Sequence, residues 1–377
     1  MTINRSYGIT ILARRFFRYV ASISLLQATP ERPLLGLAMN LSDFHFPFDP
    51  ALVAKHPIHP RDHARLLVLN RHQKQIVDRQ VKDLPEILQP GDVLVVNDTK
   101  VIPARLVGKK VPSGGHIEML FVKTIDSTHA EVLMNGRARI GQRVEFQGRG
   151  QAQIVEKQPG RTVIAWLGPD SLHAHLRQYG ALPLPPYLKR EPVVGDNEDY
   201  QTMFANVEGA VASPTASLHF TPSLIQALSD KGIGCVTITL HVGPGTFQPV
   251  KTELVEEHTM HAEWFQVSEH VVKQIQEVRQ RGGRVVAVGT TVARSLESAA
   301  NAERELKARS GETQLFIFPG YRFKVVDVLM TNFHFPETTL LMLVSAFAGV
   351  ETTRQAYAHA LRERYRLYSY GDAMLIQ

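Results

Sequence analysis

From residue 210 onward the chain alternates predicted helices and strands, and this alternation limits the possible fold more than any other feature. Each helix is bounded by recognisable start and stop residues. The order is a helix from Thr221-Pro222 to Gly232, the strand "CVTITL", a helix capped by Ser268 and ended at Gly282-Gly283, the strand "RVVAV", a helix in "GTTVARSLES", the strand "VVDVLM" and a helix after "TNFHFPETT". Because "RVVAV" and "VVDVLM" are apolar on both faces, we predict an α/β fold with a largely parallel, helix-covered sheet.

Between residues 101 and 181 the pattern changes to short strands with alternating polarity. Turn residues such as Asn135-Gly136 separate the runs "HIEMLFVK", "AEVLMN", "RVEF", "AQIVEK" and "TVIAWLG". This spacing predicts a small antiparallel β-barrel. A predicted helix from Ser171 to Tyr179 then leads the chain out. We therefore expect a main α/β domain formed by 39–100 and 182–377, interrupted by an inserted β-barrel domain at 101–181.

Residues 1–38 have a composition of their own. They carry five Arg and one Glu, a balance of +4 out of +6 for the whole chain. An Arg-rich, amphipathic segment is typical of organelle transit peptides, but this one lacks an apolar core followed by a small-residue cleavage site. We expect an extension without a fixed fold, or a mis-assigned start upstream of Met39.

Composition excludes two classes of protein. The longest apolar stretch, "LLMLVSAFAGV" (340–350), is too short to cross a bilayer, so we expect no membrane association. A single cysteine, Cys235, cannot form a disulfide framework within one chain, which favours a reducing cytoplasm. Outside residues 1–38 the net charge is only about +2, a weak indication of nucleic-acid binding.

Three loops follow predicted strands at their carboxyl ends, where α/β folds bind their ligands: "HVGPGTF", "GTT" and "TNFHF". We expect them to converge. Gly243 and Gly245 allow the backbone to approach a ligand closely, although Gly-Pro-Gly is also a common tight turn. Thr290 and Thr291 begin a helix and are placed to hold a carboxylate there.

Histidines are the other candidate functional groups. His219, His241 and His334 lie beside apolar residues in loops, where a histidine is commonly a hydrogen-bonded structural group. His258 and His261 are three residues apart, a spacing compatible with a metal ligand pair, and Glu257 and Glu263 adjoin them. Known signatures for dinucleotides, for nucleoside triphosphates and for zinc proteases do not occur.

Nine segments together carry a resemblance to a known family. They are "GDVLVVNDTKVIPARL", "PLPPYLKR", "EDYQTMFA", "GAVASPTASLHFTPSL", "TLHVGPGTFQPV", "HTMHAEW", "VGTTVARSLES", "VVDVLMTNFHFPETTLLMLVSAFAG" and "YRLYSYGDAML". In this order they resemble the S-adenosylmethionine:tRNA ribosyltransferase-isomerase family of queuosine biosynthesis, from Met39 to the C-terminus.

The resemblance implies a cytoplasmic enzyme with a barrel-like α/β main domain and an inserted β-barrel. It implies transfer of the ribosyl group of S-adenosylmethionine to 7-aminomethyl-7-deazaguanine at the tRNA wobble position. The pentose is isomerised to an epoxycyclopentanediol, giving epoxyqueuosine-tRNA, and adenine and methionine leave. S-adenosylmethionine is then a substrate, and we expect no cofactor and no metal.

This chemistry needs a base beside the sulfonium, a neutral amine and a proton donor for adenine. We expect His219, His241 and His334 to supply acid and base groups, with Glu263 near the sulfur or the amine. The expected substrate-binding residues are Gly243, Gly245, Thr290, Thr291, Arg294 and Asn332, with Arg294 or the Thr290–Thr291 helix start holding the methionine carboxylate.

For the tRNA partner we expect contacts through basic side chains and a stacking aromatic residue. The candidates are Arg105, Lys109, Lys110, Tyr187, Lys189 and Arg190. Each basic residue has the ordinary alternative of a solvated surface position. We expect the chain to act as a monomer.

The sequence departs from the family at Ser213 and Ser217, where Ala and Gly are usual. A serine at 217 would be strained if that position required a positive φ. Two other functions stay open: a metal-dependent hydrolase that uses His258 and His261, and an RNA-binding protein without catalytic activity.

Overall fold

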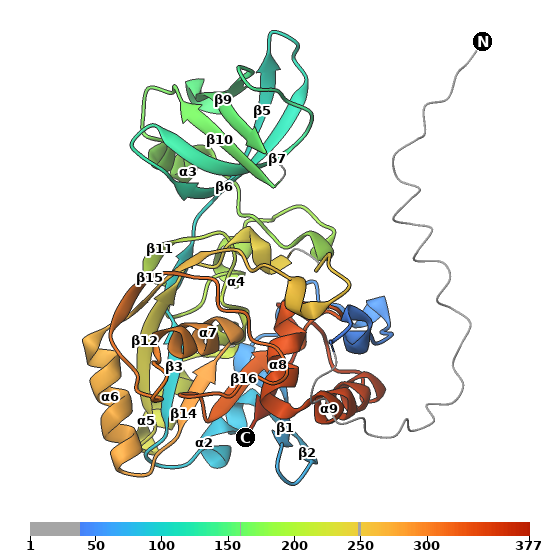
Figure 1. The fold of residues 1–377 in the computed structure, drawn as a ribbon, viewed down its shortest axis with the longest axis vertical. Coiled ribbons are helices and arrows are strands. Elements are labelled where there is room, and N and C mark those ends of the chain that lie inside the picture. The colour runs from blue at the N-terminus through green and yellow to red at the C-terminus, as the bar shows by residue number, and fades with distance from the viewer. Residues whose placement is uncertain (1–37, 159, 248–249) are drawn as a thin grey trace, which may run out of the picture.

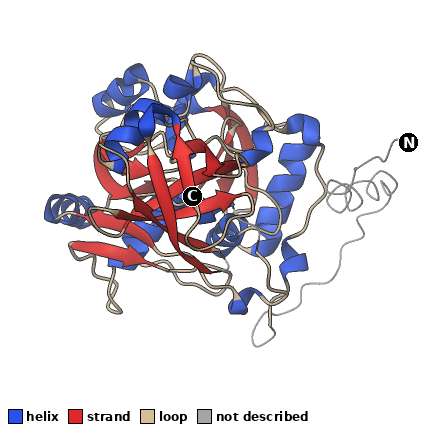
Figure 2. Cartoon of the chain, turned by 90° about the horizontal axis from the view of Figure 1, so that it is seen from above, coloured by secondary structure: helices blue, strands red, loops and turns tan. Residues whose placement is uncertain are grey.

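The structure is a computed structural model that describes residues 38–158, 160–247 and 250–377. The predictions made for residues 1–37 lie outside these ranges. Figure 1 shows a β-barrel standing above a larger α/β body, and Figure 2, seen from above, shows helices around the periphery of the strands.

The α/β body is built on one nine-stranded sheet. In spatial order its strands are β15 (Arg309–Thr313), β13 (Glu263–Val267), β12 (Gly234–Leu240), β3 (Val93–Asn97), β14 (Val285–Val288), β16 (Val328–Asn332), β17 (Ala373–Ile376), β1 (Arg65–Asn70) and β2 (Gln75–Gln80). The central strands β12, β3, β14 and β16 are parallel. Farther out, only the β1–β17 pair is parallel. The prediction of a largely parallel sheet therefore holds for the centre and is wrong for the margins.

Helices cover both faces of this sheet because its central strands are apolar on both sides. In β3, Val93 and Val95 pack into one core cluster, whereas Leu94 and Val96 pack into another. The first cluster contains side chains of α6 (Glu269–Gln280), α7 (Thr290–Ala299), α8 (Thr339–Ala348) and α9 (Val350–Arg362). The second contains side chains of α2 (Leu84–Ile87) and α5 (Pro222–Asp230). The body is thus a three-layer α/β/α arrangement.

Helix starts follow the predicted capping residues. The hydroxyls of Ser171, Thr221 and Ser268 each accept a hydrogen bond from a first-turn N–H group of α3 (Leu172–Tyr179), α5 and α6. A further short helix, α4 (Asp196–Asp199), lies in the segment between the barrel and α5.

The upper body is a closed antiparallel barrel. Its strands, in spatial order, are β10 (Arg161–Trp166), β7 (His129–Asn135), β6 (His116–Thr124), β5 (Arg105–Val111), β8 (Arg143–Phe146) and β9 (Gln151–Gln158). Alternating side chains such as Ile117, Met119 and Phe121 of β6 fill its interior. The α/β fold class with an inserted antiparallel barrel is therefore confirmed. β4 (Thr99–Val101) and β11 (Val207–Ala210) form a small separate sheet.

No helix in the described part of the chain is long and apolar enough to cross a membrane. Ser217 lies in a 3-10 helix, η7 (Thr215–His219), and it is not among the residues with a positive φ. The serine therefore causes no backbone strain at this position.

Candidate functional site

Two cavities lie above the carboxyl ends of the central strands and adjoin at Val242, the one described residue that lines both. The first, here called the α7 cavity, has a volume of about 360 Å³ and is lined by the start of α7, the β16–α8 loop and residues around Ser213 and Tyr368. The second, the barrel cleft, has a volume of about 480 Å³ and lies between the barrel and the "HVGPGTF" loop. Both volumes suit small-molecule sites.

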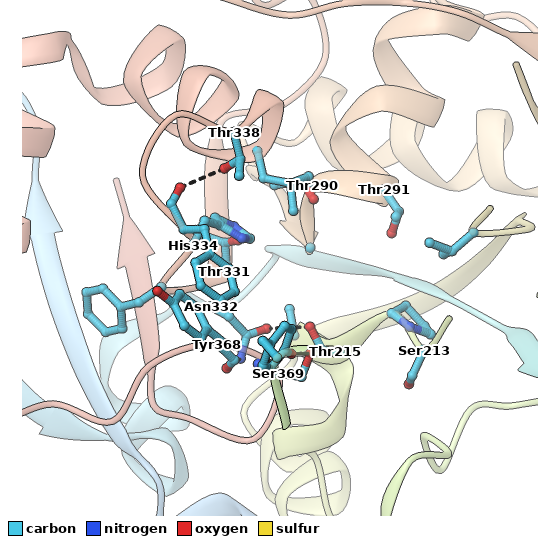
Figure 3. Close-up of a pocket in the computed structure, with 18 of the residues that line it drawn as sticks. Ser213, Thr215, Thr290, Thr291, Thr331, Asn332, His334, Thr338, Tyr368 and Ser369 are labelled. Carbon is cyan, nitrogen blue, oxygen red and sulfur yellow. Dashed lines mark hydrogen bonds between the residues drawn. The ribbon is translucent and has the colours of Figure 1, made fainter. Parts of the chain in front are cut away.

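The N-terminus of α7 forms one wall of the α7 cavity. Gly289, Thr290 and Thr291 all line it. Thr290 and Thr291 are labelled in Figure 3. Gly289 is the N-cap residue and has a φ of 99°, which only glycine adopts without strain. The first N–H groups of a helix have no intrahelical acceptor and carry the positive end of the helix dipole. This wall can therefore bind an anionic group without a basic side chain.

Aromatic rings form another wall of the α7 cavity. Phe335 and Tyr368 stack with ring centroids 3.4 Å apart, and Tyr187 lies 5.1 Å from Phe335 and 5.2 Å from Tyr368. Burial raises the pKa of Tyr187 to about 12, so its hydroxyl stays protonated and donates to Ser369. The buried Tyr368 hydroxyl has no hydrogen-bond partner among the described residues. None of the described residues that line this cavity is acidic, Lys or Arg.

His334 and Asn332 of the β16–α8 loop also line the α7 cavity. The Nε2 atom of His334 lies 2.7 Å from Thr331 Oγ1, and its backbone N–H donates to the Tyr357 hydroxyl at 2.9 Å. Burial lowers the pKa of His334 to about 3, so its imidazole is neutral. The Asn332 amide accepts from Thr215 Oγ1 at 3.0 Å, the contact drawn as a dashed line in Figure 3.

His219 lies behind this wall and lines neither cavity. It is 4% exposed, and its Nε2 atom is 3.2 Å from Asn332 Nδ2. Burial, followed by the nearby charges of Arg366 and Arg61, lowers the pKa of His219 to about 3. The structure thus places His219 behind the lining of the α7 cavity, and its expected role as an acid or base stays a prediction. His219 is placed to orient Asn332.

The barrel cleft contains His241, which comes directly after β12. Its Nδ1 atom lies 2.8 Å from Thr99 Oγ1, and its ring stacks on Trp264 with centroids 5.1 Å apart. Burial lowers the pKa of His241, although Asp98 opposes the shift. A neutral imidazole held at Nδ1 leaves Nε2 as the atom available for proton transfer.

Glu263 lines the barrel cleft, but both of its carboxylate oxygens have partners. One accepts from Gly243 N–H at 2.8 Å, and the other forms an ion pair with Arg294. Both side chains are almost fully buried, and Arg294 Nε also donates to Leu315 O at 3.1 Å. Arg294 lines neither cavity. Its ion pair is with Glu263, and its expected role in holding a substrate carboxylate stays a prediction.

The two glycines of "HVGPGTF" differ in the space around them. A Cβ on Gly245 would come 2.6 Å from the ring of His261, whereas a Cβ on Gly243 would meet only Glu263, at 3.7 Å. Both glycines line the barrel cleft, so their expected role in substrate binding stays a prediction, and Gly245 is in addition packed closely against His261.

His258 and His261, considered above as a pair of metal ligands, are not joined by a third metal-binding side chain among the described residues. No group of three or more His, Cys, Asp or Glu side chains suited to a metal occurs in the described residues. His258 instead packs edge-on against Phe316 with centroids 5.4 Å apart.

The residues expected to bind RNA are dispersed. Arg105 pairs with Glu118 and Glu191, and Arg190 forms a two-pronged ion pair with Asp196 at 2.6 Å. Tyr187 belongs to the aromatic wall. Lys109 and Lys110 lie near the end of β5, and Lys189 is exposed beside the α7 cavity residue Pro186.

Several lining residues were not found from the sequence. Phe335, Tyr368 and Trp264 were not singled out, because nothing local distinguishes them from core aromatics. Gly209 was also missed, although a Cβ there would come 2.7 Å from the His241 ring. For these residues the sequence offers one signal, the position of Phe335 in a loop that follows a predicted strand.

Comparison with known proteins gives consistent matches. The family model described as "Queuosine biosynthesis protein" matches residues 41–376. The S-adenosylmethionine:tRNA ribosyltransferase-isomerase of Xanthomonas oryzae pv. oryzae is 48% identical over 345 residues, which cover 90% of this chain and 97% of that protein. The enzyme of the same name from Xylella fastidiosa (strain M12) is 50% identical over 340 residues, with 90% and 97% covered. A crystal structure of the S-adenosylmethionine tRNA ribosyltransferase of Thermotoga maritima matches with a TM-score of 0.53 and 34% identity, covering 89% of this chain and 100% of that one.

Proposed function

The chain belongs to the queuosine biosynthesis family of S-adenosylmethionine:tRNA ribosyltransferase-isomerases, and from this membership we propose how its two cavities divide the substrates. The reaction transfers the ribosyl group of S-adenosylmethionine to the aminomethyl group of 7-aminomethyl-7-deazaguanine at the tRNA wobble position. The pentose is isomerised to give epoxyqueuosine-tRNA, and adenine and methionine are released. S-adenosylmethionine binds in the α7 cavity, and the modified base binds in the barrel cleft.

The observation that carries this proposal is the contact of the two cavities at Val242. A reaction that joins two substrates requires their reacting atoms to meet within about 3–3.5 Å. Two adjoining compartments, one in the α/β body and one beside the barrel, provide that arrangement for a small molecule and a nucleotide of a large RNA.

The walls of the α7 cavity match the charges of S-adenosylmethionine. Its carboxylate is bound by the first N–H groups of α7, at Thr290 and Thr291. Its sulfonium lies against the faces of Tyr187, Phe335 and Tyr368, since aromatic faces attract cations. The absence of acidic side chains among the described lining residues favours a ligand cation that is balanced by aromatic rings.

In the barrel cleft, His241 is placed to accept or donate the proton that moves at the reacting carbon or amine. Its neutral form suits a base, and the Thr99 contact fixes its orientation. Trp264, stacked on His241 and half-exposed, offers a face for the extruded base. A base in the anticodon loop is already partly unstacked, so extruding it costs less than flipping a base from a duplex.

The test is incubation of the purified chain with S-adenosylmethionine and tRNA that carries the deazaguanine precursor. We expect epoxyqueuosine by nucleoside mass analysis, with adenine and methionine released in equal amounts. His241→Ala should lower the maximal rate by roughly a hundredfold or more. The matched control His270→Ala changes an exposed histidine of α6 and should leave the rate unchanged.

Two outcomes would contradict the proposal. Tight tRNA binding without consumption of S-adenosylmethionine would indicate an RNA-binding protein without catalytic activity. Loss of product release in excess chelator, restored by added metal, would favour a metal-dependent reaction and a role for His258 and His261.

A further inference from the structure

The positive charge of the chain is concentrated in the barrel. Residues 105–166 contain ten Lys and Arg and five Asp and Glu, a balance of +5, while residues 39–104 and 167–377 together carry −3. The weak net charge outside residues 1–38 therefore hides a strong asymmetry between the two bodies. A localised basic surface, unlike a small overall charge, is the usual electrostatic sign of nucleic-acid binding.

Much of this charge lies at one end of the barrel. β5 starts at Arg105, which pairs with Ala181 of the chain leaving the barrel, and it ends at Val111. At about 3.3 Å per residue, Val111 lies roughly 20 Å along the strand from the α/β body. The basic residues at this far end, here called the tip patch, are Lys109, Lys110, Arg137, Arg139, Arg143 and Lys157.

The loop between β7 and β8 (136–142) is held in place by hydrogen bonds to neighbouring strands. Lys110 Nζ donates to Arg137 O at 2.9 Å, and Lys157 Nζ donates to Ala138 O at 2.7 Å. Gly141 N donates to Ile154 O at 2.8 Å. The loop is therefore fixed while it presents Arg137 and Arg139, whose side chains are exposed.

The charges of the tip patch are not neutralised within the molecule. None of its six side chains forms an ion pair with any described residue. Glu145 lies opposite Lys109 in the β5–β8 pairing without an ion pair between them. By contrast, Arg105 and Arg161 of the same barrel are both paired with glutamates. Positive side chains without an ion pair, carried by strand ends and by a fixed loop, suit a polyanion.

We propose that the tip patch binds phosphates of the helical stem of the tRNA, at a distance from the reacting base. This inference rests on the proposed function, because it takes tRNA as the partner and the barrel cleft as the place of its base. A base in the cleft leaves its stem outside, beside the barrel that flanks the cleft. Helical RNA is recognised through its shape and its phosphates, so this contact is independent of sequence.

The experiment compares three triple variants by the salt dependence of tRNA affinity. The test variant is Arg137→Gln, Arg139→Gln and Arg143→Gln, and a second variant changes the same residues to Lys. The control is Arg79→Gln, Lys82→Gln and Arg281→Gln, which removes the same charge from exposed positions of the α/β body. Melting temperatures check that each variant is folded, and the single variants Arg137→Gln and Arg139→Gln replace the test triple if it is not.

We expect the Gln triple to reduce the steepness of log K against log salt by about 2.7, the value for three lost phosphate contacts at about 0.9 each on a double helix. The KM for tRNA should rise roughly tenfold or more, while kcat at saturating tRNA and the affinity for S-adenosylmethionine stay unchanged. The Lys triple and the control should keep the wild-type slope.

A slope for the Gln triple equal to that of the control overturns the inference and leaves the proposed function standing. An equal loss in the Lys triple also overturns it, because charge alone would then not explain binding. If the wild type binds tRNA with a slope that depends on the tip patch but forms no epoxyqueuosine, the proposed function fails and the inference stands.

Discussion

Gly209 provides the space in which the His241 ring sits. A Cβ at position 209 would lie 2.7 Å from two ring atoms of His241, closer than non-bonded carbon atoms approach. Gly209 also has a φ of 153°, and it follows Glu208 in β11, a strand that pairs with β4 beside Thr99. The same small sheet therefore supplies both the Thr99 hydroxyl and the space for the imidazole.

Gly209→Ala is expected to lower turnover about as much as His241→Ala, roughly a hundredfold, because the methyl group displaces the imidazole. The affinity for tRNA should change little. Steady-state release of adenine and direct tRNA binding measure the two effects. Turnover within threefold of wild type would show that the position of His241 is not critical.

Gly243→Ala and Gly245→Ala form a matched pair within one loop. Gly245→Ala brings a methyl group to 2.6 Å from His261 and should move this loop, lowering turnover by at least tenfold. Gly243→Ala makes only ordinary contacts and should stay within about threefold of wild type. The reverse order of these effects would mean that Gly243 faces a bound substrate and that packing of Gly245 against His261 does not limit turnover.

The ion pair of Glu263 and Arg294 is expected to be structural. Glu263→Gln leaves a buried guanidinium without its counter-charge and should lower the free energy of unfolding by about 3–5 kcal/mol. The double variant Glu263→Gln, Arg294→Met removes that unpaired charge and should recover part of the loss. Urea unfolding measures both. A stable Glu263→Gln protein with strongly reduced turnover would instead return Glu263 to a catalytic role.

The centre of the fold was predictable because its signals are local. Runs such as "RVVAV" are apolar on both faces, and the hydroxyls of Ser171, Thr221 and Ser268 cap the helices that follow them. β15 was not predicted because its sequence, "RSGET", has no apolar pattern and gains its place only by pairing with β13. Strand direction at the sheet margins likewise depends on pairing between distant segments.

The site was predictable only as far as the three loops. Val242, Gly289 and Asn332, one from each loop region, do line the α7 cavity. That His219 lies behind Asn332, and that Arg294 is paired with Glu263, depends on which way side chains turn in the folded core. No spacing in the sequence carries that information. The aromatic wall similarly joins Tyr187, Phe335 and Tyr368 from separate parts of the chain.

Stability is expected to fall between neutral and mildly acidic pH. The pKa values of His219 and His334 are lowered to about 3, from 6.5 in the unfolded chain, so the unfolded state binds more protons below pH 6.5. Their contribution is complete above pH 6.5 and is lost as the pH falls towards 3. As the pH falls below 6.5, each histidine should lower the free energy of unfolding by about 1.4 kcal/mol per pH unit.

Denaturant unfolding at pH 7.5 and 5.5 measures this effect. His219→Gln should be less stable than wild type at pH 7.5 but should lose less stability on acidification, by about 1 kcal/mol. If His219→Gln and wild type lose the same free energy of unfolding between pH 7.5 and pH 5.5, His219 is not the group that titrates.

The binding of a carboxylate at α7 can be separated from any role of the threonine hydroxyls. If the N–H groups at the start of α7 hold the methionine carboxylate, a ligand that lacks this carboxylate should bind roughly ten- to a hundredfold more weakly, the scale of a hydrogen bond to a charged group. Thr290→Val keeps the backbone N–H and removes only the hydroxyl, so its affinity for S-adenosylmethionine should fall less than about fivefold. Calorimetric titration of both ligands into both proteins gives all four affinities. If Thr290→Val loses as much affinity as removal of the carboxylate does, the contact is made by the hydroxyl. If wild type binds the two ligands with equal affinity, the carboxylate lies elsewhere in the cavity.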